Sequence, residues 1–211
     1  MKSLMTGVAA AVLVAGSASA GVADYTVGFD GVSNNNAANT AAGESQFRLV
    51  VSASGADVLF TFYNDGPADS VMSELYWDDD AGLLDSMLSI DDSDAGVSYE
   101  SVGSSVNPAN MPAGNTIAFT ADFATEPNNP QPHNGVGVGE SVGVLFSHSG
   151  AFQDIVNAIE SGELRIGLHA QSFANGGSES FVTSTGVPSP SAAALGLLMI
   201  AGLGNRRRRQ H

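Results

Sequence analysis

Period-two alternation of apolar and polar residues runs through most of this chain, and it limits the possible fold more than any other feature. In residues 58–63, for example, Val58, Phe60 and Phe62 share one face and the residues between them share the other. Successive side chains of a strand point to opposite faces of a sheet, so such runs predict half-buried β-strands. We expect about ten short strands, at 25–29, 46–52, 58–63, 71–77, 83–90, 97–102, 117–123, 142–147, 164–173 and 179–183.

One segment has helical periodicity instead. Its apolar residues recur at i, i+3, i+4 and i+7, and polar residues cover the other face, which predicts an amphipathic helix from Phe152 to Ile159. Ser161 and Gly162 can end it. Residues 33–42 and 126–134 are polar and turn-rich, and we expect loops there. One helix among these strands predicts a mainly β fold, an antiparallel β-sandwich with the helix lying over an edge or end.

The charge of the chain is unevenly distributed. All 22 acidic residues lie between Asp24 and Glu179, and Arg48 and Arg165 are the two basic residues in that stretch. The resulting net charge of about −20 attracts cations and repels phosphate backbones, which argues against nucleic-acid binding. The chain has no cysteine, which excludes disulfides, cysteine-ligated metals and a thiol nucleophile.

Residues 1–20 have the composition of a secretory signal peptide. Lys2 is the positive start, residues 8–15 are apolar, and Ala18 and Ala20 are the small residues that a signal peptidase accepts. We therefore predict a signal helix, export of the chain, and cleavage before Gly21. The alternative is a buried N-terminal helix, which Gly16 and Ser17 would end early.

Residues 187–211 form a tail of three parts. It begins with Val187, Pro188, Ser189 and Pro190, continues with twelve apolar or glycine residues at 192–203, and ends with Arg206, Arg207, Arg208 and Arg209. The prolines force an extended entry. As a helix the apolar run spans about 18 Å, less than a hydrocarbon core of about 30 Å, and the arginines favour the cytoplasmic side. Such a short hydrophobic helix can pause in a membrane during export but is a poor permanent anchor.

This order of proline motif, short hydrophobic helix and arginine cluster resembles the PEP-CTERM sorting tail of Gram-negative bacteria, with Ser189 where the family usually has glutamate. The resemblance implies recognition and cleavage by an integral-membrane exosortase. The alternative is a plain membrane anchor, and in both cases the body, 21–186, faces outward. The body also resembles a β-rich ectodomain found with such tails, through residues 73–84 and 164–181. That second resemblance implies no activity.

One motif suggests a hydrolase. Gly139, Ser141 and Gly143 match the G-x-S-x-G nucleophile elbow, for which His148 or His169 would be the base. That elbow joins a strand to a helix, whereas residues 142–146 alternate as a strand. We therefore interpret residues 135–141 as a glycine-rich turn leading into a strand and predict no enzymatic activity.

The acidic segment 77–94 is the strongest chemical candidate. Asp78, Asp79, Asp80 and Asp85 bracket a turn at Gly82, and calcium binds six to eight oxygens on flexible loops. No EF-hand spacing is present. The two hypotheses are a calcium site on these four aspartates and solvated acidic turns with loosely associated cations. We expect no other cofactor, since His133, His148 and His169 lack metal-ligand spacing.

The aromatic residues beside this segment give two further hypotheses. Tyr76 and Trp77 can stack on a sugar as in lectins, or they can pack in the core, as a lone tryptophan usually does. His169 alternates with Leu168 on a strand, and we expect it at the surface or at an interface. The sequence as a whole favours a non-enzymatic protein of the cell envelope or extracellular matrix, in contact with extracellular polysaccharide. The alternative is a calcium-assisted carbohydrate-binding module.

Overall fold

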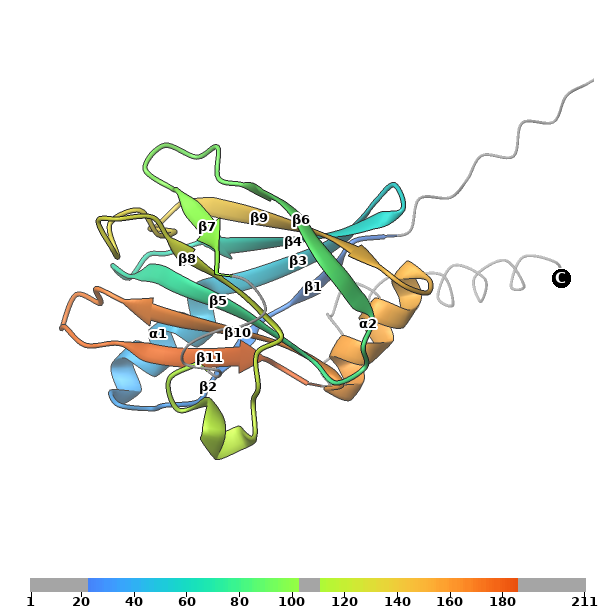
Figure 1. Ribbon diagram of the computed structural model, residues 1–211. Coiled ribbons are helices and arrows are strands. Elements are labelled where there is room, and N and C mark those ends of the chain that lie inside the picture. The colour runs from blue at the N-terminus through green and yellow to red at the C-terminus, as the bar shows by residue number, and fades with distance from the viewer. Residues whose placement is uncertain (1–22, 103–110, 186–211) are drawn as a thin grey trace, which may run out of the picture.

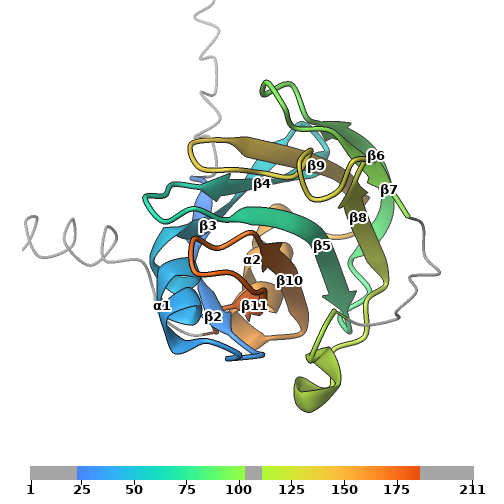
Figure 2. The same cartoon turned by 90° about the vertical axis from the view of Figure 1, so that its left-hand side faces the viewer.

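The computed structural model describes residues 23–102 and 111–185, and these form two antiparallel sheets. The five-stranded sheet has the order β1 (Tyr25–Val27), β3 (Phe47–Ser54), β4 (Asp57–Asn64), β9 (Ser141–His148), β6 (Leu84–Asp91). The six-stranded sheet has the order β2 (Phe29–Gly31), β11 (Glu179–Thr183), β10 (Leu164–Gln171), β5 (Val71–Asp79), β8 (Phe123–Pro127), β7 (Tyr99–Ser101). The sheets lie face to face (Figure 1, Figure 2), so the predicted mainly β, two-sheet architecture is confirmed.

The core lies between the two sheets and is rich in aromatic rings. Trp77 of β5 is fully buried, and its ring centroid lies 5.0 Å from that of Phe146, 5.6 Å from Phe62 and 5.9 Å from Phe60. These three phenylalanines belong to β4 and β9 of the opposite sheet. The period-two alternation thus directs the apolar faces of both sheets into one core.

A second, smaller apolar cluster lies on the outer face of the six-stranded sheet. There Tyr76 and Ala124 are covered by Met111, Phe119 and Ala121, from the segment that contains the short 3-10 helix η1 (Gly114–Ile117). The predicted strand at 117–123 is therefore wrong. Ala113 and Ala118 have positive φ angles of 62° and 51°, which break an extended chain, and the apolar residues of this segment face the back of the sheet.

The helix content also differs from the prediction. The expected helix is present as α2 (Phe152–Ser161), ended by Gly162 at φ 78°, but α1 (Ala37–Gln46) forms in a region predicted as loop. The buried residues of α1 are Asn39, Gly43 and Gln46, so the helix has no apolar stripe to detect.

The cause of α1 is distant in sequence. The Asn36 side chain accepts the amide of Ala38 at 2.9 Å, and the buried Glu179 of β11 accepts the amides of Asn35 and Asn36. The helix begins here because Asn36 satisfies the amides of Ala38 and Asn39 in its first turn, while Glu179 holds the two residues that precede the helix.

Two strand boundaries were also missed. The predicted strand at 25–29 is split at Gly28 into β1 and β2, which join different sheets. β8 extends to Glu126 and Pro127, at the start of the second expected loop. The chain therefore forms eleven strands in the described residues rather than about ten.

Candidate functional site: the acidic β5–β6 hairpin

The β5–β6 hairpin separates the two aspartates that end its first strand. Asp78 and Asp79 are consecutive on β5, so their side chains point to opposite faces of the sheet. The turn is closed by the amide of Gly82, which donates to the carbonyl of Asp79 at 3.0 Å, and Gly82 has φ 62°. Strand geometry therefore prevents these neighbours from sharing one ligand.

Asp78 lies on the outer face and pairs with Arg165 of β10. Its side chain is 3 % exposed, and its Oδ2 accepts from the Arg165 guanidinium and from the amide of Thr120 at 3.1 Å. Burial raises the pKa of Asp78, while the Thr120 amide and the charge of Arg165 oppose that rise. Arg165 also donates to the carbonyls of Ile117 and Ala118 at 2.7 and 2.8 Å. The ion pair therefore fastens the segment that covers the sheet.

Asp79 points inward and is only partly satisfied. Its Oδ2 accepts the amide of Leu84 at 2.7 Å, whereas its Oδ1 is buried without a hydrogen-bond partner. The amide of Asp79 donates to Oδ2 of Asp122 at 2.8 Å. Asp79 and Asp122 line a depression of about 270 Å³, together with Gly82, Leu84 and Phe123.

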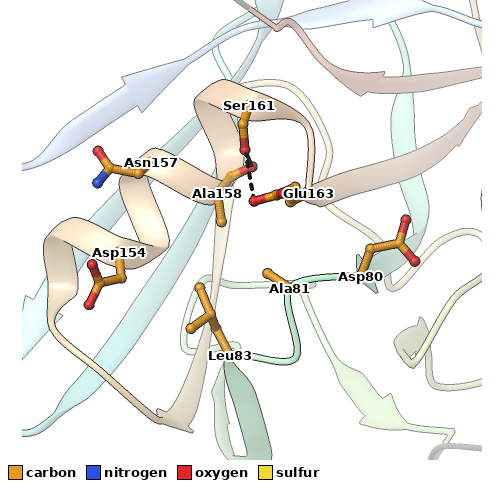
Figure 3. Close-up of a pocket in the computed structure, with 8 residues that line it drawn as sticks. All are labelled: Asp80, Ala81, Leu83, Asp154, Asn157, Ala158, Ser161 and Glu163. Atoms are coloured by element: carbon orange, nitrogen blue, oxygen red, sulfur yellow. Dashed lines mark hydrogen bonds between the residues drawn. The ribbon is translucent and has the colours of Figure 1, made fainter.

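Asp80 and Asp85 are exposed, and they do not join the other two aspartates. Asp80 lines a separate depression of about 630 Å³ between the turn and α2, along with Asp154 and Glu163 (Figure 3). Figure 3 shows these three carboxylates pointing in different directions. Within residues 23–102 and 111–185, no group of three or more histidine, aspartate or glutamate side chains is placed to hold a metal ion. The four predicted calcium ligands therefore do not converge.

The aromatic pair beside the hairpin is buried. Trp77 is 0 % exposed and Tyr76 is 4 % exposed, under Met111 and Phe119. The core-packing interpretation of Trp77 is confirmed. The hypothesis that these two rings form a sugar-stacking surface is wrong, because neither offers an open face.

Ser141 has the surroundings expected of a turn residue. It is the first residue of β9, after Gly139 at φ 83°, and its hydroxyl donates to Asp94 at 3.0 Å. The strand-to-helix elbow is absent here, and the interpretation as a glycine-rich turn leading into a strand is confirmed. His148 lies at the other end of β9, about 23 Å away along the strand.

His169 departs from the prediction. It is 8 % exposed, and its Nδ1 lies 3.0 Å from the Ser180 hydroxyl, so the expected surface position is wrong. Its neighbours across the sheet are Ser180 on β11 and Glu74 on β5. The hydroxyl of Ser33 accepts a hydrogen bond from the amide of Ser180 at 2.9 Å, so the loop of residues 33–36 lies against β11 beside His169.

Three residues of this region escaped sequence reasoning: Arg165, Asp122 and Glu179. The sequence shows that Arg165 is one of two basic residues in the acidic stretch, but its pairing with Asp78 depends on the register of β10 and β5. Asp122 lies in a segment misassigned as strand. Glu179 gives no local sign that it holds the residues before α1, because the amides it accepts, those of Asn35 and Asn36, are more than 140 positions away.

The remaining predicted sites fall outside the described residues. These are the processing residues Ala18, Ala20 and Gly21, the motif Val187, Pro188, Ser189 and Pro190, and the cluster Arg206, Arg207, Arg208 and Arg209, together with both predicted terminal helices. The helices in the described part of the chain are all too short or too polar to cross a membrane. No protein-family model, no curated protein and no solved structure matches this chain.

Proposed function

We propose that this chain is a non-enzymatic protein of the cell envelope or extracellular matrix of a Gram-negative-type bacterium. In this proposal, signal peptidase removes residues 1–20 during export. An exosortase then recognises the tail that begins at Val187 and cleaves it. The outward-facing body, a mainly β domain, is released or retained in contact with extracellular polysaccharide.

The observation that carries the proposal is the position of the two ends of the described body. Tyr25, at the start of β1, lies within reach of the charge of Glu160 on α2; burial raises the pKa of Tyr25, and this charge adds to the rise. Thr185 lies at the same C-terminal end of α2, where a Cβ on Gly162 would approach its Cγ2 to 3.3 Å. Both ends are thus on the α2 side of the molecule (Figure 1). Two processing events at that side leave the sheets and their core intact.

The charge of the body supports the same proposal. The described residues contain all 22 acidic side chains and two arginines, and Arg48 and Arg165 are both paired with aspartates. A surface of this kind keeps a protein soluble and repels nucleic acid. The carbohydrate-binding alternative has lost its stacking residues, so we do not carry it further.

Mass spectrometry of the protein from its native host tests the proposal. We expect a chain that starts near Gly21 and lacks Arg206 to Arg209. A double variant, Pro188→Ala with Pro190→Ala, should keep the arginines. The matched control Ser189→Glu restores the proline-glutamate-proline motif and should be processed normally. Recovery of the intact arginine cluster in the secreted protein would contradict the proposal.

A further inference from the structure

Asp79 is a buried carboxylate with one oxygen left unsatisfied. It is 8 % exposed, and only Oδ2 has a partner, the amide of Leu84. Neither arginine of the described chain pairs with it, since Arg165 binds Asp78 and Arg48 binds Asp65. Burying a charge without a counter-charge is costly, and buried polar atoms in native proteins nearly always have a partner. The Oδ1 atom of Asp79 therefore needs a positively charged or hydrogen-bonding partner.

A second carboxylate is held beside it by main-chain bonds. The amide of Asp122 donates to the carbonyl of Trp77 at 2.8 Å, and Oδ2 of Asp122 accepts the amide of Asp79 at 2.8 Å. The side chain of Asp122 is exposed, and both aspartates line the same depression of about 270 Å³. One carboxylate thus comes from the inner side of the hairpin and the other from the segment that leads into β8.

We propose that this depression binds a hard divalent cation of the calcium type, with Asp79 and Asp122 as its charged ligands. Its lining offers no histidine, and the chain has no cysteine, so the available donors are oxygens, which calcium prefers. Main-chain carbonyls and water complete the coordination. Asp78, Asp80 and Asp85 take no part.

Two carboxylates make a weak site. Affinity rises with the number of charged ligands, so we expect a dissociation constant of about 10⁻⁴–10⁻³ M, as in extracellular calcium modules. A bound cation would add a link between the β5–β6 turn and the start of β8, just beyond the point where β5 and β8 pair in the sheet, at Trp77 and Phe123. The inference does not depend on the processing of either end of the chain.

Terbium luminescence tests this site directly, because Tb³⁺ substitutes for calcium at oxygen ligands. Trp77 is the only tryptophan of the chain and lies two residues before Asp79 on the same strand face, about 7 Å along the strand. Excitation of the indole in the full chain should give saturable Tb³⁺ emission that millimolar Ca²⁺ displaces. Trp77→Phe should abolish the emission while Ca²⁺ still raises the melting temperature.

Two variants and two controls locate the cation. Asp79→Asn should abolish the emission, and Asp122→Asn should weaken Tb³⁺ binding at least tenfold. Asp80→Asn and Asp85→Asn remove the same charge from the same hairpin and should leave binding unchanged. If Asp79→Asn does not fold, Asp122→Asn against its controls still decides the matter.

Two results would overturn the inference. One is equal loss of emission in all the folded variants, which would place the cations diffusely over the acidic surface. The other is no saturable emission up to about 10 mM, tenfold above the weakest class of such sites. A water molecule would then satisfy Asp79 Oδ1.

Discussion

At the scale of single residues, the two arginines of the described chain occupy opposite environments. Arg165 and Asp78 have side chains 19 % and 3 % exposed, whereas Arg48 and Asp65 are 36 % and 50 % exposed. Arg48 also lies 4.1 Å from the centroid of the Tyr63 ring. Removing one partner of a buried pair leaves a desolvated charge, whereas solvent screens the partner that remains at an exposed site.

The substitution Arg165→Met should therefore lower the free energy of unfolding by roughly 3–5 kcal/mol at pH 7, measured by urea denaturation. Arg48→Met is the matched control and should cost at most about 1 kcal/mol. Lowering the pH should reduce the loss in Arg165→Met, because protonation removes the unpaired charge of Asp78. Equal losses in the two variants would show that the buried pair does not stabilise the fold.

The buried side chain of His169 makes the free energy of unfolding depend on pH. Burial lowers its pKa and outweighs the opposing charge of Glu179, so the unfolded chain takes up a proton first, near the ordinary pKa of about 6.5. Stability contributed by His169 is therefore present above that pH and is lost as the pH falls below it. Burial raises the pKa of Glu74 on β5, helped by the charge of Glu126 and opposed by a hydrogen bond from Ser73. The burial of Glu74 therefore costs stability while its carboxylate is ionised, and this cost disappears as the pH falls.

We expect His169→Gln to lose less stability than the parent between pH 7.5 and 5.5. The difference in slope should be at most about 1.4 kcal/mol per pH unit, since one proton is involved. Urea unfolding at both pH values measures it. His133→Gln, on an exposed loop, is the control and should follow the parent. Identical slopes in all three proteins would exclude His169 as the titrating group.

At the scale of elements, the segment from Met111 to Ala121 is fastened to the six-stranded sheet in two ways. Arg165 and Asp78 bind its main chain, and Gly167 of β10 lets its apolar side chains approach. A Cβ on Gly167 would lie 2.6 Å from Met111 Sδ and 3.1 Å from the Phe119 ring. Because Gly167 has no side chain, Met111 and Phe119 of this segment can pack against β10.

Gly167→Ala should displace the segment and destabilise the protein by about 1–3 kcal/mol, the usual cost of overpacking. Amide hydrogen exchange should accelerate first in residues 111–121. Gly28→Ala is the control, because a Cβ there meets nothing within 4 Å, and it should change stability by no more than about 0.5 kcal/mol. Unchanged exchange in the 111–121 segment would mean that Gly167 has no part in its docking.

At the scale of the whole molecule, the position of the two ends of the described body predicts which side of it would face a membrane that holds the tail. β10 begins beside α2 and ends at Gln171, so the β10–β11 connection lies at the opposite end of the molecule (Figure 1). If the tail holds the protein at the membrane, α2 faces the cell and the β10–β11 connection faces outward.

Single-cysteine labelling tests this orientation, because the chain has no cysteine of its own. Asn157→Cys on α2 and Asn175→Cys in the β10–β11 connection are both at exposed positions. On intact cells a bulky maleimide should react several-fold faster at position 175, because the tethered end is shielded. Protein released into the medium should react equally at both. Equal rates on cells would contradict tethering at the α2 end.

The local features of this protein could be predicted from its sequence, because periodicity reports which face of an element is apolar. It placed most strands, the helix α2 and the turn before β9, whereas it left Trp77 between the core and a sugar-stacking surface. It failed for two segments whose conformation depends on tertiary contacts with the six-stranded sheet. α1 has no apolar face, and residues 117–123 pack on the outside of a sheet.

The candidate site was decided by tertiary structure. Asp78 meets Arg165 across 87 positions, and Asp79 meets Asp122 across 43. Strand register and sheet order determine which side chains meet over such separations, and both are properties of the assembled sheets. The sequence by itself determined that carboxylates gather in one hairpin. The folded chain determined that one is neutralised by an arginine, one is left buried with an unsatisfied oxygen, and two remain in solvent.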